Sequence, residues 1–364
     1  MIMQDIIKNL NDKSMIIKDL NEQDVIKDKK INSFFLTVAN SNLRIGCKIL
    51  KSDFYLDSFN YFPITDKNFS FRNLFKWSNA SPERYNNFYT KSFSENFFQR
   101  RKNFKKISDA VILGSSPSNS YFRNIMTFLP RIFFISDEEV SLAIHRNTSN
   151  KFRFFIKEIL KQKNVKVKKF IYLDDDFYKF NNCQIPQFFT NAASTIILSN
   201  SLSYTKIDSG LKIYLSRQNS DCRNLINEGD LIEKLKSKNF MIIDTKNMSI
   251  FEQIKIFSAA DVIIGPTSSA LTNLVFSKKG TRVIEIVPKY RHSYEKTFIG
   301  RYSKICKYLD LNYMSVEADP VNNNNLNHNT NKFISRKILE ESNYYKDLLI
   351  EVKKFEKIIS VFNN

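Results

Sequence analysis

Two arginines in the second half of the chain have the type and spacing needed to bind a diphosphate. Arg217 and Arg223 lie six residues apart in a polar segment after the apolar run 211–215, with Asn227 and Glu228 close behind. Guanidinium groups form charge-assisted, bidentate hydrogen bonds with phosphate oxygens. The alternative is that both are ordinary surface arginines of a basic protein, and the residue types alone leave it open.

A turn of small residues supplies a second set of candidate ligand contacts. It consists of Gly265, Pro266, Thr267, Ser268 and Ser269. Such residues let the backbone approach a ligand closely, and the N-terminus of a helix expected at 268–276 favours an anion. Alternatively, the hydroxyl groups simply cap that helix. The turn has neither the spacing of a Walker A loop nor that of a dinucleotide-binding glycine motif.

Acidic residues offer two further candidates. Glu285 lies within the apolar run 282–287, where its carboxylate can bond ribose hydroxyls or pair with a nearby lysine. The run 174–176 is three consecutive aspartates, which resembles a metal site, but no second acidic cluster accompanies it. The four cysteines are widely separated and only three histidines are present. We therefore expect no metal site and no disulfide framework.

Short apolar runs alternate with amphipathic segments after residue 106, which predicts a parallel sheet flanked by helices. In the first part we expect three strands, at 109–114, 140–144 and 168–173, and two helices, at 121–129 and 152–163. In the second part we expect four strands, at 211–215, 240–243, 261–264 and 282–287. Three helices should separate them, at 225–236, 249–259 and 268–276. Ser249 and Glu252 have the spacing of a capping box at the start of the second helix.

This pattern indicates the fold class α/β with two Rossmann-like domains and four regions in all. The regions are an N-terminal extension packing on the first domain (1–105), a Rossmann-like domain (106–205), a second Rossmann-like, nucleotide-binding domain (206–318), and a loop with a closing helix (319–364). Residues 1–50 are expected to form mixed helical and strand-like segments, with apolar spacing within 6–20 that is typical of a helix. One long amphipathic helix is predicted at 336–361.

The net charge of +19 limits the partners. Nucleic acid, an anionic membrane and phosphorylated substrates all suit such a field, but a solvated lysine-rich surface explains it as well. Aromatic residues alternate with Arg and Lys within 54–106, which fits base stacking or simple core filling. No nucleic-acid-binding motif is present, and the basic residues form no single stripe, so we expect no nucleic-acid partner.

The chain has no run of 18 apolar residues and no signal-peptide pattern at its N-terminus, so we expect a cytoplasmic protein. The basic amphipathic segment 151–163 leaves two alternatives open. It can lie on an anionic membrane surface, or it can pack its apolar face against the sheet.

Six motifs, taken in order and spacing, resemble glycosyltransferase family 61. Five are in the second half, at 213–217, 223–228, 252–260, 265–276 and 283–286. The sixth, Leu129-Pro130-Arg131, resembles the family's LPR segment. The resemblance extends from about residue 106 to residue 313 and leaves out the first hundred residues.

The resemblance implies a GT-B fold and an inverting transferase that uses a nucleotide sugar without a bound metal. Arg217 and Arg223 would stabilise the departing diphosphate, the turn 267–270 would bring backbone amides to phosphate, and Glu285 or Glu252 would contact the nucleoside. The full set of expected donor-binding residues is Arg217, Arg223, Asn227, Glu228, Glu252, Gln253, Gly265, Pro266, Thr267, Ser268, Ser269, Asn273 and Glu285.

Two departures from the family pattern affect the catalytic base. Members commonly have Gly-Pro-His-Gly-Ala where this chain has Gly-Pro-Thr-Ser-Ser-Ala at 265–270. They also commonly have a histidine where this chain has Arg123, and their acidic residue between that position and the LPR arginine aligns near Thr127. The base is therefore unassigned, with Asp109 and Arg123 as candidates.

The expected function is transfer of a hexose or pentose from a nucleotide sugar to a glycan or lipid-linked acceptor during synthesis of a bacterial capsule or other surface polysaccharide. A UDP-sugar is the preferred donor, although the residues do not themselves choose UDP over CMP or GDP, and no cofactor is expected. The enzyme would be cytoplasmic and peripheral on the inner membrane. Two alternatives remain: a nucleic-acid-binding protein, or a catalytically inactive partner in a polysaccharide assembly.

Overall fold

The computed structural model describes residues 7–10, 13–18, 30–37, 44–58, 62–65, 69–71, 104–114, 120–202, 210–218, 220, 223–290, 296–321 and 342–362. The chain divides into two compact units, Met1–Ile197 and Leu198–Asn364. Both units are mixed α/β structures that contain parallel strands. Among the described residues, no helix is long and apolar enough to cross a membrane.

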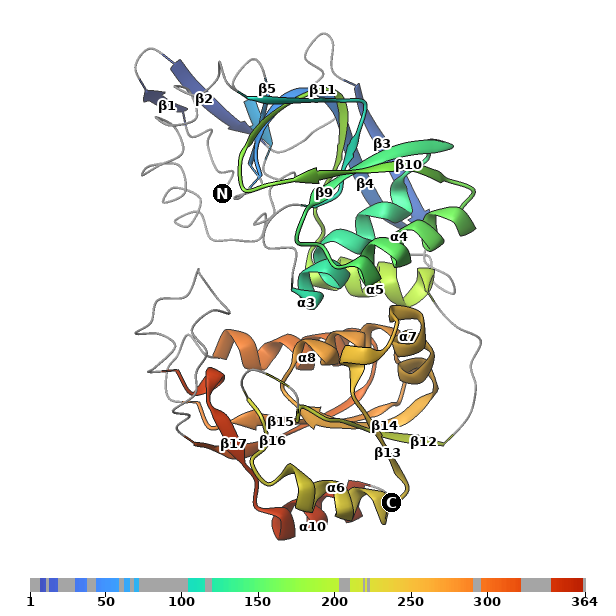
Figure 1. Cartoon of the computed structure of the whole chain (residues 1–364), viewed down its shortest axis with the longest axis vertical. Helices are drawn as coiled ribbons and strands as arrows, with labels where there is room; N and C mark the ends of the chain where they lie inside the picture. Colours follow the sequence, from blue (N-terminus) through green and yellow to red (C-terminus); the bar gives the residue numbers. More distant parts are fainter. Residues whose placement is uncertain are drawn as a thin grey trace. The chain divides into compact units, whose positions relative to one another are not determined.

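Unit 1 is built on an eight-stranded sheet (Figure 1) with the order β10-β9-β8-β11-β4-β3, in which β5 also pairs with β4 and β7 with β11. The strands are β3 (Lys30–Thr37), β4 (Arg44–Asp57), β5 (Phe62–Thr65), β7 (Lys105–Ser108), β8 (Val111–Ile112), β9 (Glu139–His145), β10 (Lys166–Leu173) and β11 (Phe177–Pro186). Strands β7 to β11 pair in parallel, whereas β4 is antiparallel to β11, β3 and β5. Strands from before residue 106 therefore extend the first sheet.

The N-terminal segment forms strands where its apolar spacing predicted a helix, so that prediction was wrong. β1 (Ile7–Leu10) and β2 (Lys13–Lys18) pair antiparallel, and β2 pairs in parallel with β6 (Phe69–Phe71). Short groups of two or three apolar residues fit the period of a helix as well as that of a strand. In this segment, pairing with a distant strand selects the strand.

Helical segments of unit 1 follow β8 and β9. A continuous stretch contains α3 (Tyr121–Arg123), a π-helical turn η4 (Asn124–Phe128) and a 3₁₀ segment η5 (Leu129–Phe134). The predicted end of this helix at residue 129, before Pro130, was wrong, because proline is tolerated in the first turn of the 3₁₀ segment that follows. α4 (Asn150–Gln162) is capped by Ser149 and buries Phe152, Phe155, Ile156, Ile159 and Leu160, so its apolar face packs inside the unit. The last helix of the unit, α5 (Asn191–Ser201), spans the boundary between the units.

Unit 2 has a six-stranded sheet with the order β13-β12-β14-β15-β16-β17. The strands are β12 (Leu211–Leu215), β13 (Phe240–Ile243), β14 (Ala260–Pro266), β15 (Arg282–Pro288), β16 (Asn312–Val321) and β17 (Asp347–Leu349). All pairs are parallel except β16 with β17. The four predicted strands of this unit are confirmed, whereas β16 was not foreseen.

Helices cover both faces of this sheet (Figure 1). One face carries α7 (Ile250–Ala259), the 3₁₀ segment η7 (Ser269–Phe276) and α8 (Lys296–Tyr308), and the other carries α6 (Glu228–Lys236) and α10 (Val352–Phe362). Tyr214, Ile264, Ile284 and Phe355 belong to the core on the α6 and α10 side. The capping box of Ser249 and Glu252 at the start of α7 is confirmed.

The prediction of a single long helix at 336–361 is wrong for residues 342–361, which are the part that the structure describes. From residue 342 the chain forms a 3₁₀ turn η10 (Asn343–Tyr345), then β17, then α10. Leu348 also bridges to Leu225, which explains why α6 begins at Glu228 and not at the predicted residue 225. Long-range strand pairing overrides local helix propensity in both segments.

Candidate functional site

The strand order of unit 2 creates a switch point between β12 and β14. Taken in chain order, its five parallel strands run 2-1-3-4-5, so the connections from β12 and β14 leave in opposite directions across the sheet. Ligands of such sheets bind outside the carboxyl ends of the strands at this point. The strands approach closely here, because a Cβ on Gly265 would lie 2.8 Å from Leu215 Cβ. The two loops that the sequence singled out are the ones that flank the switch point.

Glu228 organises the loop after β12. Its Oε1 accepts hydrogen bonds from the Tyr214 hydroxyl at 2.8 Å and from the Arg217 backbone N–H at 3.0 Å. Burial raises the pKa of the Tyr214 hydroxyl well above its usual value, so it remains a donor. Arg217 Nε in turn donates to the carbonyl oxygen of Arg223 at 3.3 Å, and Arg223 has a left-handed backbone with φ of 60°. The two arginines thus belong to one folded loop that a buried carboxylate holds.

The C-terminal segment of the chain fixes the same loop from outside. The Leu348 N–H donates to Asn224 O, and the Ile226 N–H donates to Leu348 O, both at 2.8 Å. Asn227 Nδ2 donates to Ile350 O at 2.8 Å, and Asn227 Oδ1 accepts from the Ile350 N–H at 3.2 Å. The Asn227 side chain therefore bonds to the backbone N–H and C=O of Ile350, as a residue of a neighbouring strand would. These contacts give Asn227 a structural role.

Replacing Asn227 with alanine is expected to lower the free energy of unfolding by about 2 kcal/mol, because two hydrogen bonds to Ile350 are lost together. Urea denaturation would measure the change. The matched control is Asn312→Ala, which removes one exposed hydrogen bond of 3.3 Å to Gly280 O and should cost less than 1 kcal/mol. Equal losses in the two variants would contradict the structural role of Asn227.

Glu285 is fully buried in the centre of β15, opposite Gly265 of β14 and Ser315 of β16. Burial raises the pKa of its carboxyl group to about 7, although the nearby Thr267 hydroxyl, the hydrogen bond from Tyr313 and the charges of Arg301 and Arg223 oppose the shift. The Tyr313 hydroxyl donates to Oε2 at 2.7 Å. The influence of Arg223 on this pKa connects the loop after β12 with the buried carboxylate.

Several buried polar atoms of β15, of the turn after β14 and of η7 have no hydrogen bond of ordinary geometry. Four of the buried atoms without an ordinary hydrogen bond are Glu285 Oε1, Thr267 Oγ1, Ser268 Oγ and Thr272 Oγ1, and others lie elsewhere in the described part of the protein, among them Ser58 Oγ and Ser194 Oγ. The Thr267 hydroxyl is near enough to lower the pKa of Glu285, yet it forms no hydrogen bond of ordinary geometry. Unsatisfied buried groups are uncommon in native proteins and each calls for an explanation. The Glu285 carboxylate and the neighbouring Thr267 hydroxyl are groups that a ligand with hydroxyl groups would satisfy.

The turn after β14 differs from the expectation in one respect. The Thr267 N–H already donates to Ile286 O at 2.8 Å, so it is not available to phosphate. The following segment is a 3₁₀ helix whose first residue, Ser269, is exposed. The buried hydroxyls, and not the Thr267 amide, are the distinctive feature of this turn.

Three other predicted contacts lie in supporting positions. Glu252 is exposed and caps α7 by accepting from the Ser249 N–H at 2.7 Å. Asn273 Nδ2 donates to Gln253 Oε1 at 2.8 Å, and Gln253 Nε2 donates to Thr245 O at 3.2 Å. Both amides are buried and fasten η7 to α7, which holds the turn 267–268 in place. Sequence reasoning missed Tyr313 and Arg301, because it predicted neither β16 nor α8.

The two candidate bases of unit 1 are not brought to the same edge of the sheet. Asp109 precedes β8, whereas Arg123 lies in α3, after the carboxyl end of β8. Asp109 Oδ1 accepts from Asn182 Nδ2 at 2.5 Å. The catalytic base therefore has no assignment from these contacts.

The aspartates at 174–176 have cationic or histidine partners. Asp174 pairs with Arg146, Asp176 Oδ2 lies 3.0 Å from Lys105 Nζ, and Asp175 Oδ1 lies 3.1 Å from His145 Nε2. Among the described residues, no three acidic, histidine or cysteine side chains form a group suited to a metal ion.

The family model for Glycosyltransferase 61 matches residues 61–284. The chain belongs to glycosyltransferase family 61. No curated protein matches the chain significantly. The match begins at residue 61 and ends at residue 284, so the expected range of 106 to 313 was wrong at both ends: residues 61–105 belong to the match, whereas residues 1–60 lie outside it as expected. It includes both loops of the switch point, and membership of this family supports glycosyl transfer from a nucleotide sugar to a glycan acceptor.

Proposed function

We propose that this family 61 member is an inverting glycosyltransferase of the GT-B type, with domains at 106–205 and 206–318 that bind acceptor and donor, respectively. The donor is a nucleotide sugar, with a UDP-sugar preferred, and the acceptor is a glycan or lipid-linked glycan of a bacterial surface polysaccharide. The nucleotide is bound at the switch point of unit 2.

One observation carries this proposal. Glu285 is a fully buried carboxylate with a pKa of about 7, and its Oε1 has no hydrogen bond of ordinary geometry among the described residues, beside the Thr267 hydroxyl, which is in the same condition. A ribose hydroxyl that donates to Glu285 Oε1 would satisfy the carboxylate. Phosphate oxygens would accept from Thr267 and Ser268. The same contacts would be unnecessary in a protein whose surface only attracts nucleic acid.

The arginines give the site its charge complementarity. In an inverting transfer, the acceptor oxygen bonds to the anomeric carbon as the bond from that carbon to the diphosphate breaks, and a base takes the acceptor proton. Negative charge grows on the departing diphosphate. Arg217 and Arg223, held by Glu228 and by the C-terminal segment, are the groups we expect to stabilise it.

The same proposal puts the enzyme at the cytoplasmic face of the inner membrane. Besides the net charge of +19, α4 exposes 59% of Phe154, and Arg153 lies 5.2 Å from the ring centre of the half-exposed Tyr172. Sedimentation with anionic vesicles at low salt tests this placement, and an absence of lipid-dependent pelleting would exclude it.

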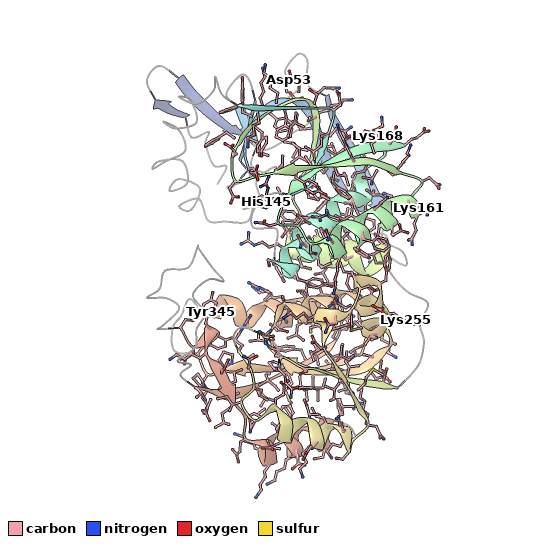
Figure 2. All side chains as sticks on the ribbon, viewed as in Figure 1. Asp53, His145, Lys161, Lys168, Lys255 and Tyr345 are labelled. Carbon is pink, nitrogen blue, oxygen red and sulfur yellow. The ribbon has the colours of Figure 1, made fainter. Side chains whose placement is uncertain are left out.

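Turnover of nucleotide sugars tests the proposed activity. Purified protein is incubated with UDP-, GDP-, CMP- and dTDP-sugars, and release of free nucleotide is measured. One donor class should be consumed, and Arg217→Ala should reduce the rate at least 100-fold, because it removes stabilisation of the leaving group. The matched control is Lys255→Ala, on the exposed side of α7 (Figure 2), which should retain full activity. Nucleotide binding without any turnover would instead support an inactive partner in a polysaccharide assembly.

A further inference from the structure

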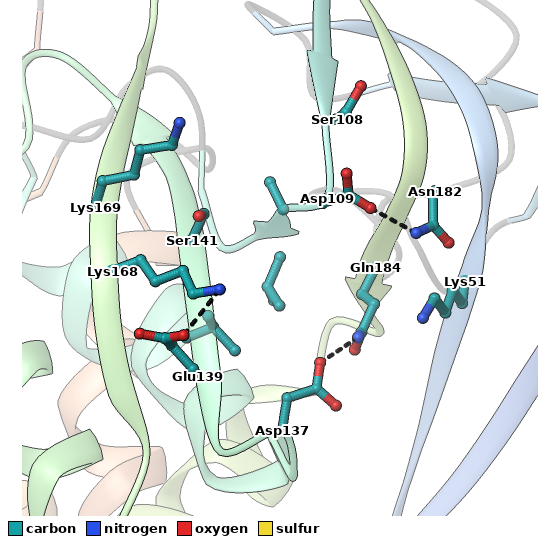
Figure 3. Close-up of a pocket in the computed structure, with 13 residues that line it drawn as sticks. Lys51, Ser108, Asp109, Asp137, Glu139, Ser141, Lys168, Lys169, Asn182 and Gln184 are labelled. Carbon is teal, nitrogen blue, oxygen red and sulfur yellow. Dashed lines mark hydrogen bonds and ion pairs between the residues drawn. The ribbon is translucent and has the colours of Figure 1, made fainter.

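Three irregularities of the unit 1 sheet meet at one pocket, shown in Figure 3. The register of β10 against β9 shifts between Val167 and Lys169, so Lys168 is an extra residue and both lysines line the pocket. Between β7 and β8, Asp109 has a left-handed backbone with φ of 54°. In β11, Asn182 has φ of 51°, at a register shift against β4. β-Bulges redirect side chains, and they are over-represented next to functional sites.

The two left-handed residues are joined to each other across the pocket wall. Asn182 Nδ2 donates to Asp109 Oδ1 at 2.5 Å, and the Asn182 N–H donates to Asp53 Oδ1 at 2.7 Å. Asp and Asn tolerate this conformation better than most residues, but it is still less favourable than a regular strand. Two neighbouring residues with a strained, left-handed backbone persist only where the surrounding contacts enforce this conformation. Such backbone strain is concentrated at functional positions.

Opposite charges are balanced in this pocket, in contrast to the +19 of the whole chain. Its lining includes the cations Lys51, Lys168 and Lys169 and the anions Asp109, Asp137 and Glu139. An ion pair and a hydrogen bond join residues of the lining: Lys168 Nζ lies 2.8 Å from Glu139 Oε2, and Gln184 Nε2 donates to Asp137 Oδ2 at 2.6 Å. Lys51 and Lys169 have no ion-pair partner within the described part of the chain. Donors and acceptors thus alternate around one cavity.

This chemistry discriminates between ligand classes. Three carboxylates offset the three ammonium groups, so the pocket has no net positive charge to select a phosphate or a polyanion, and the mostly polar lining would not favour an apolar molecule. A saccharide hydroxyl can donate to a carboxylate and accept from an ammonium or amide group at the same time. The volume of about 490 Å³ falls within the range of small-molecule sites.

We propose that this pocket binds a neutral saccharide segment of a glycan, away from the hydroxyl that reacts. The position supports this separation. The pocket uses the first residues of β9, Glu139 to Ser141, whereas the carboxyl edge begins at His145, about 13 Å further along the strand. The pocket would therefore hold a part of the acceptor chain remote from the growing end. That the saccharide belongs to the acceptor rests on the proposed function, whereas saccharide binding itself does not.

A glycan array probed with labelled full-length protein, followed by calorimetry on the best neutral oligosaccharide, tests the proposal. Lys169→Ala and Asp137→Ala alter exposed side chains of the pocket, and each should weaken saccharide binding about tenfold, the effect of one charge-assisted hydrogen bond. Lys157→Ala, on the exposed face of α4 and outside the pocket lining, is the matched control and should bind as the wild type does.

The outcomes separate this proposal from the proposed function. It is wrong if no neutral glycan binds, if the pocket variants bind like the control, or if inorganic phosphate displaces the saccharide. UDP binding, measured in parallel, should be unchanged in both pocket variants. Saccharide binding that depends on Lys169 and Asp137, in a protein that binds no nucleotide, would uphold the pocket and overturn the donor site.

Discussion

Replacing Arg131 with methionine is expected to lower the free energy of unfolding by about 4 kcal/mol. Arg131 is fully buried and its guanidinium group bonds to three backbone carbonyls. Nε donates to Pro186 O at 3.0 Å, Nη2 donates to Ile112 O at 3.0 Å and to Pro186 O at 2.6 Å, and Nη1 donates to Leu113 O. Methionine fills much of the space but leaves these carbonyl oxygens buried without a donor. Chemical denaturation followed by circular dichroism would measure the loss.

Arg146→Met is the matched control for this experiment. Arg146 is 62% exposed and its ion pair with Asp174 is at the surface, so its loss should cost less than about 1 kcal/mol. Arg131→Lys should resemble Arg131→Met more than the wild type, because one ammonium group cannot bond three carbonyls in a plane. A loss at Arg131 no larger than at Arg146 would contradict this account.

The Arg131 result would define the role of the LPR segment in this chain. Its arginine connects the carboxyl ends of β8 and β11, and its guanidinium carbon lies 4.1 Å from the ring centre of Phe188. These contacts join β8 and β11 at that edge of the unit 1 sheet. Arg131 is therefore a positioning residue by its contacts.

Glu285→Gln is expected to make the protein about 3 kcal/mol more stable at pH 8 and to leave its stability nearly unchanged at pH 4.5. Burial raises the pKa of the Glu285 carboxyl group from 4.5 to about 7 in the folded protein. Below pH 4.5 the group is protonated in both the folded and unfolded states. As pH rises from 4.5 to about 7, only the unfolded state loses the proton, so wild-type stability falls. Glutamine cannot ionise, so the variant avoids this loss.

Urea denaturation at several pH values between 4.5 and 8 would measure the divergence of the two proteins. Glu317→Gln, at an exposed position of the neighbouring strand β16, is the control and should follow the wild-type profile. Wild-type and Glu285→Gln curves that remain parallel across this range would contradict the buried carboxylate. A variant that is more stable and yet binds nucleotide more weakly would identify Glu285 as a residue kept for function at the expense of stability.

The fold of unit 2 could be predicted from sequence where its strands are buried on both faces. β12, β14 and β15 are apolar runs that end at polar, glycine or proline residues, which is the pattern of a parallel sheet. β16 was not predicted because half of its residues are exposed and polar residues and a proline interrupt its apolar residues. β11 escaped because the bulge at Asn181 and Asn182 interrupts its alternation.

The candidate site could be predicted only in part. Arg217, Thr267 and Glu285 were predicted to contact a ligand because of their residue types and their positions after or within a strand, and this stays a prediction. Asn227 has the same polar character, but its partner Ile350 is 123 residues away, and nothing in the local pattern reveals that pairing. Gln253 and Asn273 bond to each other in the same way, across 20 residues. Local sequence thus identifies polar residues at the right edge but does not separate those that face a ligand from those that hold the loops.

Nucleotide binding to the switch point of unit 2 is the central claim, and a thermal-shift titration with UDP, GDP, CMP and dTDP tests it most directly. A nucleotide at about 100 times its dissociation constant should stabilise the wild-type protein by roughly 2.7 kcal/mol. We expect one nucleotide, with UDP preferred, to raise the melting temperature, and the shift to disappear in Arg217→Ala. No shift with any of the four nucleotides, or a shift that Arg217→Ala preserves in full, would contradict the assignment of the donor site.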